Sequence, residues 1–84
     1  MFEVYVLYSK DFDKIYIGFT SDLNNRILSH NQLATKGFTI KYRPWTVIHT
    51  EQFPSKKEAM VREKQLKSFK GRMFIREIIE KSKK

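Results

Sequence analysis

The sequence contains no cysteine, which excludes disulfide bonds and thiolate zinc sites. Its two histidines are too few to hold a structural metal unaided. Nowhere do about eighteen uncharged apolar residues follow one another, as a membrane-spanning helix requires. The first residues, MFEVYVLYS, lack the basic start and long apolar run of a signal peptide, so we expect a cytoplasmic protein. The 84 residues suffice for one small domain, residues 1–84, whose stability must come from packing.

Acidic residues are also scarce, since nine Asp and Glu stand against seventeen Lys and Arg, for a formal net charge of +8. The net positive charge could simply reflect a basic surface. The basic residues are dense between residues 56 and 84, however, which favours contact with phosphates. An anionic membrane is the rival partner, although a small core needs the apolar residues of the last segment. We therefore expect DNA and no membrane. The candidate nucleic-acid-binding residues are Lys64, Lys67, Lys70 and Arg72.

The pattern of side chains predicts an α+β fold with the element order β-β-α-β-α-α. Two β-branched and aromatic segments separated by a short polar break indicate a β-hairpin. Ser55 and Glu58 form a capping box, which opens the second helix, and Gly71 separates that helix from the third. The expected elements are strands at 3–9 and 14–19, a helix from 23 to about 31, a loop at 32–43, a strand at 45–50, and helices from 56 and at 72–81.

Two tyrosines lie in the predicted hairpin. If the hairpin closes around residues 10 and 11, Tyr5 lies directly across from Tyr16, and both phenols point to one side of the sheet. The pair could simply pack as aromatic neighbours. Gly18 favours a further role, because a glycine inside a strand leaves bare backbone that another group can approach closely, although a β-bulge would also explain it.

Arg26 and His30 stand four residues apart on the first predicted helix, so they share one flank of it. A guanidinium beside the buried face is suited to binding a phosphate and its transition-state charge, whereas the alternative is a surface salt bridge. His30 could shuttle a proton or donate to a phosphate, or it could be favoured only by the negative end of the helix dipole.

Glu63 lies on the face of the second helix that the apolar stripe marks as buried, so its carboxylate needs a partner. A nearby lysine would satisfy it, and so would Mg²⁺, which keeps most of its waters and takes one or two carboxylates plus substrate phosphate. The sequence leaves both possibilities open. Glu58 is the poorer candidate because it belongs to the capping box.

Together these residues resemble the GIY-YIG nuclease superfamily, and in particular its small stand-alone bacterial members. The segments VYV at residues 4–6 and YIG at residues 16–18 match the two motifs, and the helical arginine, histidine and glutamate follow in order. Asn31 beside the histidine is typical of the stand-alone group. The chain departs from the larger relatives by Glu3 in place of the first glycine, Phe19 in place of a lysine, and no asparagine after the glutamate.

The resemblance implies a three-stranded antiparallel sheet flanked by helices and an endonuclease that hydrolyses DNA with Mg²⁺ or Mn²⁺, as in DNA repair or recombination. It implies Tyr5 as general base, Tyr16 as the residue that orients water or phosphate, and Arg26 as the residue that stabilises the pentacovalent charge. It places His30 at the family's histidine and Glu63 as the metal ligand. Target choice could belong to a protein partner or to a branched DNA shape.

Two other functions remain open. A non-catalytic nucleic-acid-binding module would keep the fold and stack bases on aromatic side chains, with affinity but no cleavage. The candidate stacking residues are Tyr5, Tyr8, Tyr16, Phe19 and Tyr42. A protein-interaction domain that uses the amphipathic third helix is the weaker alternative.

Overall fold

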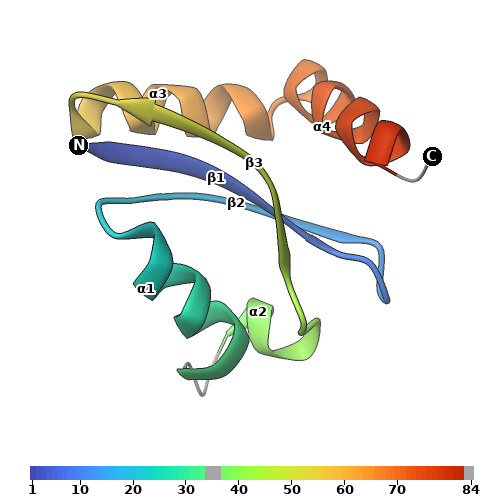
Figure 1. The fold of residues 1–84 in the computed structure, drawn as a ribbon. Coiled ribbons are helices and arrows are strands. Elements are labelled where there is room, and N and C mark those ends of the chain that lie inside the picture. Colours follow the sequence, from blue (N-terminus) through green and yellow to red (C-terminus); the bar gives the residue numbers. More distant parts are fainter. Residues whose placement is uncertain (34–36, 83–84) are drawn as a thin grey trace.

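The computed structural model describes residues 1–33 and 37–82. A three-stranded antiparallel sheet lies between two layers of helices, with α3 and α4 on one face and α1 and α2 on the other (Figure 1). The predicted α+β class and antiparallel sheet are confirmed. In the described residues, no helix is long and apolar enough to cross a membrane. The elements are β1 (Phe2–Ser9), β2 (Lys14–Thr20), α1 (Leu23–Leu28), the π-helix η1 (Ser29–Leu33), α2 (Phe38–Lys41), β3 (Thr46–Phe53), α3 (Lys56–Lys67) and α4 (Phe69–Ser82).

Strand β1 is the centre of the molecule, because the sheet has the order β2-β1-β3. Its six residues from 4 to 9 are buried, and their side chains alternate between the two helical layers. One core lies beneath α3 and α4 and consists of Val4, Val6, Tyr8, Ile17, Ala59, Leu66, Ile75 and Ile79. The second core lies beneath α1 and α2 and is built from Tyr5, Leu7 and Trp45. A strand buried on both faces explains the continuous apolar run in this part of the sequence.

The hairpin pairing differs from the predicted one by two residues. Ser9 pairs with Lys14, so the loop has the four residues 10–13, and Tyr5 lies across from Gly18 while Leu7 lies across from Tyr16. The prediction that the two tyrosines face each other directly is therefore wrong. Because a shift of two residues keeps every side chain on its face, both phenols still lie on the same side of the sheet.

Two further boundaries differ from those predicted. The segment expected to be a loop contains the short helix α2. The third strand, predicted at residues 45–50, is β3 at Thr46–Phe53, so it begins one residue later and ends three residues later than predicted. Residues 34–36 of the expected loop lie outside the described residues. The predicted cap Ser55 accepts a hydrogen bond from the Glu58 amide at 3.3 Å, and Asp22 caps α1 by accepting one from the Asn25 amide at 3.2 Å.

Gly71 does not separate the last two helices, because Ser68 ends α3 and α4 already begins at Phe69. Gly71 lies in the first turn of α4 instead. A Cβ at this position would lie within about 2.5 Å of main-chain atoms of Gln65 and Leu66. The glycine therefore allows the start of α4 to pack against the backbone at the end of α3.

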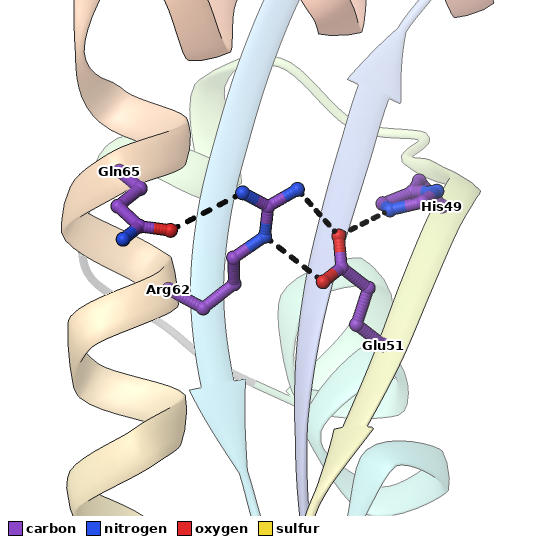
Figure 2. A network of polar contacts seen from close by, with 4 residues as sticks. All are labelled: His49, Glu51, Arg62 and Gln65. Carbon is purple, nitrogen blue, oxygen red and sulfur yellow. Dashed lines mark hydrogen bonds and ion pairs between the residues drawn. The ribbon is translucent and has the colours of Figure 1, made fainter.

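A polar network joins α3 to the edge strand β3, as Figure 2 shows. Arg62 donates two hydrogen bonds to the Glu51 carboxylate, at 2.9 and 3.0 Å, and His49 donates a third at 2.7 Å. Burial alone would raise the pKa of the Glu51 carboxyl, but the hydrogen bonds from Arg62 and His49 outweigh burial and hold this pKa below its usual value of 4.5. The network fixes α3 on the sheet by a bidentate contact.

Replacing Glu51 by Gln tests this network. We expect Glu51→Gln to lower the free energy of unfolding by about 1–2 kcal/mol near neutral pH, because the hydrogen bonds lose their charge assistance. A carboxyl whose pKa is lowered by folding stabilises the fold above about pH 4.5, and this contribution is lost as the pH falls through the folded-state pKa. Urea unfolding at several pH values measures both effects. A difference from wild type that persists unchanged in acid, or an equal loss in the control Glu77→Gln, would contradict the interpretation.

Candidate functional site

The centre of the candidate site is a contact between Tyr5 of β1 and His30 of η1. The Tyr5 hydroxyl oxygen and His30 Nε2 are 2.9 Å apart, and the two residues are only 1% and 7% exposed. Tyr16 of β2 completes an aromatic group, with its ring centroid 6.3 Å from that of Tyr5 and 4.7 Å from that of His30. The structure thus brings together three of the candidate residues named from the sequence, and each comes from a different element.

Gly18 provides the room for the Tyr5 ring. It is the cross-strand partner of Tyr5, and a Cβ at this position would lie 2.7 Å from the Tyr5 oxygen and 2.9 Å from its Cζ. The pairing of β1 with β2 runs without a register shift, so a bulge does not explain the glycine. The group that approaches the bare backbone is Tyr5 itself.

Arg26 lies on α1 beside both phenols. Burial raises the pKa of the Tyr5 hydroxyl, while a hydrogen bond from Arg26 and the charge of its guanidinium act in the opposite direction. The phenols in turn raise the pKa of Arg26, chiefly through the hydrogen bond with Tyr5. Among the described residues, the groups that raise the pKa of Arg26 are the two tyrosines and not a carboxylate, which does not support the alternative of a surface salt bridge.

His30 is held at both ring nitrogens. Its Nδ1 lies 3.1 Å from the hydroxyl oxygen of Thr39 in α2, and its Nε2 lies at Tyr5. Burial, together with the positive charges of Arg26 and Arg43, lowers the pKa of the imidazole below its ordinary value of 6.5. The imidazole is therefore neutral at neutral pH, and each of its nitrogens has one hydrogen-bonding partner.

Two side chains that the sequence analysis did not assign hold the segment that carries His30. Arg43 donates to the carbonyl oxygens of His30, at 2.6 Å, and of Ser29, at 3.1 Å. Asn31 accepts from the amide of Trp45 at 2.6 Å and donates to its carbonyl at 3.1 Å. The position of Asn31 next to the candidate histidine was the only sequence signal for this arrangement.

A pocket of about 340 Å³ opens beside these groups. Tyr16, Arg26 and His30 reach it, whereas Tyr5 lies behind them and is not part of its lining. The lining residues are Tyr16, Arg26, Ser29, His30, Gly37, Phe38 and Thr39. The pocket offers one guanidinium and one phenol to a ligand, beside an imidazole whose two nitrogens are already hydrogen-bonded, and these donors suit an anion such as a phosphate.

Glu63 lies on α3, in the opposite helical layer, yet close enough for its charge to raise the pKa of the Tyr5 hydroxyl slightly. Its carboxylate forms an i,i+4 ion pair with Lys67 at 3.5 Å, and the side chain is 19% exposed. No cluster of three or more His, Cys, Asp and Glu exists in the described part of the chain. The donors present fit Mg²⁺ bound by one carboxylate, several waters and a substrate phosphate, and they do not fit a closed protein site.

The four candidate nucleic-acid-binding residues divide into two pairs. Lys67 and Arg72 line a groove of about 170 Å³ along the edge strand β2, together with Ile15, Tyr16 and Ile17. Lys64 and Lys70 are exposed and do not line it. Tyr16 borders both this groove and the pocket at Arg26, so the two hollows share one residue.

Comparison with known proteins identifies the class. The family described as the GIY-YIG catalytic domain matches residues 1–76, and the chain belongs to this family. UPF0213 protein SH2523 of Staphylococcus haemolyticus is 35% identical over 78 residues, covering 93% of this chain and 94% of the relative. A UPF0213 protein of Halobacterium salinarum is 40% identical over 67 residues, covering 80% and 86%. The solution NMR structure of UPF0213 protein BH0048 from Bacillus halodurans has a TM-score of 0.54 at 32% identity, covering 93% of this chain and 85% of that one.

The close fit of Tyr5 over Gly18 can be tested by Gly18→Ala. We expect a loss of about 1–3 kcal/mol in the free energy of unfolding, because the new methyl group would overlap the buried phenol. Removing the phenol oxygen relieves the closest of these contacts. The double variant Gly18→Ala/Tyr5→Phe should therefore lose less free energy of unfolding than the sum of the losses in the two single variants. A double-mutant cycle by urea unfolding measures this difference. Strict additivity would show that the two residues do not interact.

Proposed function

We propose that this protein is a metal-dependent endonuclease that hydrolyses phosphodiester bonds in DNA, in a process such as repair or recombination. The main support is the contact of 2.9 Å between Tyr5 and a neutral His30, beside an arginine that faces a pocket. Packing alone does not require this combination. Membership of the GIY-YIG catalytic domain family points to the same class of reaction.

The scissile phosphate would bind in the pocket at Arg26. Its guanidinium offers the planar, permanently charged donors that suit a phosphate, and it would stabilise the extra negative charge of the pentacovalent transition state. Tyr16 borders the same pocket and would orient the attacking water or a phosphate oxygen.

Tyr5 would act as the general base, with His30 as the acceptor of its proton. An isolated buried phenol keeps its proton at neutral pH, because burial raises its pKa. In this protein, the Tyr5 hydroxyl can pass its proton to Nε2 of the neutral imidazole. The Tyr5 oxygen would take the proton of a water that reaches it between Tyr16, Arg26 and His30, the residues that separate Tyr5 from the pocket. Arg26 stabilises the negative charge on the phenol oxygen during this transfer.

Glu63 is the residue that would hold Mg²⁺ or Mn²⁺, with the remaining ligands supplied by water and substrate. When bound, the ion would supply Lewis-acid stabilisation of the leaving oxygen. Glu63 also pairs with Lys67 in this structure, so a lysine and a cation compete for one carboxylate.

The DNA backbone would follow the groove along β2. Lys67 and Arg72 line it, and Tyr16 connects it to the pocket where cleavage would occur. Lys64 and Lys70 would contact phosphates further along the strand. A protein partner could select the target, because one domain of this size has little surface for base recognition.

The binding-module alternative is weakened by burial. Tyr5 and Tyr8 are only 1% and 8% exposed, so neither can stack on a base as the sequence analysis had suggested. Tyr16, Phe19 and Tyr42 are half-buried, and this possibility stays open for them. The two functions make different predictions for Glu63.

Replacing Glu63 by Gln separates the enzyme from the binder. We expect Glu63→Gln to abolish nicking of branched, flapped or linear DNA with Mg²⁺ or Mn²⁺, while DNA affinity stays equal or rises slightly because an acidic group is removed. The melting temperature should hardly change, because an i,i+4 ion pair at the protein surface, here between a partly buried Glu63 and an exposed Lys67, contributes about 0–1 kcal/mol. Glu77→Gln serves as the matched control.

Two results would contradict the proposal. Undiminished nicking by Glu63→Gln would remove Glu63 from the catalytic site. Absence of nicking by the wild-type protein, with either ion and every DNA shape, would favour the binding module.

The proposed DNA path can be tested without cleavage, in the absence of divalent ions. Each phosphate neutralised contributes about 0.9 to the slope of log affinity against log salt concentration on duplex DNA. Lys67→Gln and Arg72→Gln should each reduce this slope by about 0.9, whereas the exposed Lys56, at the start of α3, should not matter. An effect of Lys56→Gln equal to that of the other two would place the DNA elsewhere.

A further inference from the structure

Thr39 contacts His30 and no reacting atom. It belongs to neither of the two family motifs and is not among the candidate residues named from the sequence. It lies on α2, is 6% exposed, and its hydroxyl oxygen is 3.1 Å from Nδ1 of His30. Its main-chain carbonyl accepts a hydrogen bond of 2.7 Å from the indole Nε1 of Trp45, which is itself buried. Two contacts thus hold this residue, one at the side chain and one at the main chain.

A neutral imidazole carries its proton on one nitrogen only, so the two contacts of His30 are linked. If Nδ1 carries the proton, it donates to the Thr39 hydroxyl oxygen, and Nε2 is free to accept from Tyr5. If Nε2 carries the proton, it donates to the Tyr5 oxygen, and Thr39 must donate to Nδ1. Only the first arrangement lets His30 accept the proton of Tyr5.

The surroundings of Tyr5 favour the first arrangement. The guanidinium of Arg26, which can only donate hydrogen bonds, acts on the Tyr5 oxygen and opposes the rise of its pKa. The phenol is buried, and among the described residues its hydrogen-bonding partner that can accept a proton is Nε2 of His30. If Nε2 carried a proton instead, the buried proton of the phenol would have no acceptor, which is unfavourable.

We propose that Thr39 is a positioning residue that fixes His30 in the Nδ1–H tautomer, so that Nε2 can take the proton of Tyr5. The inference rests on the proposed function for its catalytic meaning, but the tautomer is a property of the protein without DNA. In the proposed reaction the proton moves from water to Tyr5 and from Tyr5 to Nε2, while Nδ1–H stays hydrogen-bonded to Thr39. The hydrogen bond from Nδ1–H to the Thr39 oxygen then stabilises the positive charge formed on the imidazolium.

Long-range ¹H–¹⁵N correlation spectra of the labelled protein test the tautomer directly. Wild-type His30 should show the shift pattern of the Nδ1–H form, and Thr39→Ser, which keeps the hydroxyl, should show the same pattern. Thr39→Val has nearly the same shape but no acceptor, so its His30 should change to a mixture of tautomers or to the Nε2–H form. Wild-type His30 in the Nε2–H form, or a Thr39→Val spectrum identical to that of wild type, would overturn the proposal. The wild-type spectrum decides it even if Thr39→Val does not fold.

Nicking assays on the same proteins test the link to catalysis. Thr39→Val should reduce the cleavage rate by about 10- to 100-fold, the usual effect of removing a group that orients a functional histidine, with little change in DNA affinity. Thr39→Ser should restore the rate. A change of tautomer without any loss of rate would contradict the positioning role, whereas a wild-type protein that nicks no DNA would contradict the proposed function and leave the tautomer result standing.

Discussion

The hydrogen-bonding distance between Tyr5 and His30 is the constraint on which the candidate site depends. The phenol reaches this imidazole from β1, the central strand, which is buried on both faces. The phenol also needs space above the neighbouring strand, which Gly18 provides by having no side chain. Burial in turn raises the pKa of Tyr5 and lowers that of His30, so that the pair is neutral, with one proton between them. The same packing that stabilises the sheet therefore sets the protonation state of the site.

The segment that carries His30 is a π-helix, and its neighbours explain how this wider turn is held. Arg43 binds two consecutive carbonyl oxygens of the segment, and Asn31 binds both main-chain groups of Trp45. These contacts supply partners for main-chain groups at the end of the helical segment and fix it against the start of β3. Single π-turns in helices are frequent at functional sites, because they redirect one side chain without breaking the helix. The asparagine beside the histidine has here a structural reason: it holds the imidazole in place through Trp45.

The fold and most of the site could be predicted from the sequence because they follow from local patterns. Alternating β-branched residues, the cap Ser55 and the spacing of the two motifs placed the strands, the helices and the group around Tyr5. The hairpin register was missed because a loop of four residues and one of two leave every side chain on the same face, so that the apolar pattern cannot distinguish them. Thr39 and Arg43 were missed for another reason: they act across the fold on a histidine nine and thirteen residues away, through contacts with no sequence period.

Glu63 raises the remaining geometric question, since it belongs to the helical layer opposite Arg26 and His30. A closed sheet would keep the two layers apart, but β2 is an edge strand, with Tyr16 bordering both the basic groove and the pocket. A phosphodiester bound at this edge would meet groups from both layers. Gly18, two residues from Tyr16 on the same strand, is covered by the Tyr5 phenol, so the phosphate would lie beside Tyr16 itself. In the proposed reaction, the guanidinium of Arg26 from α1 and the carboxylate of Glu63 from α3 would act on that phosphate from the two layers.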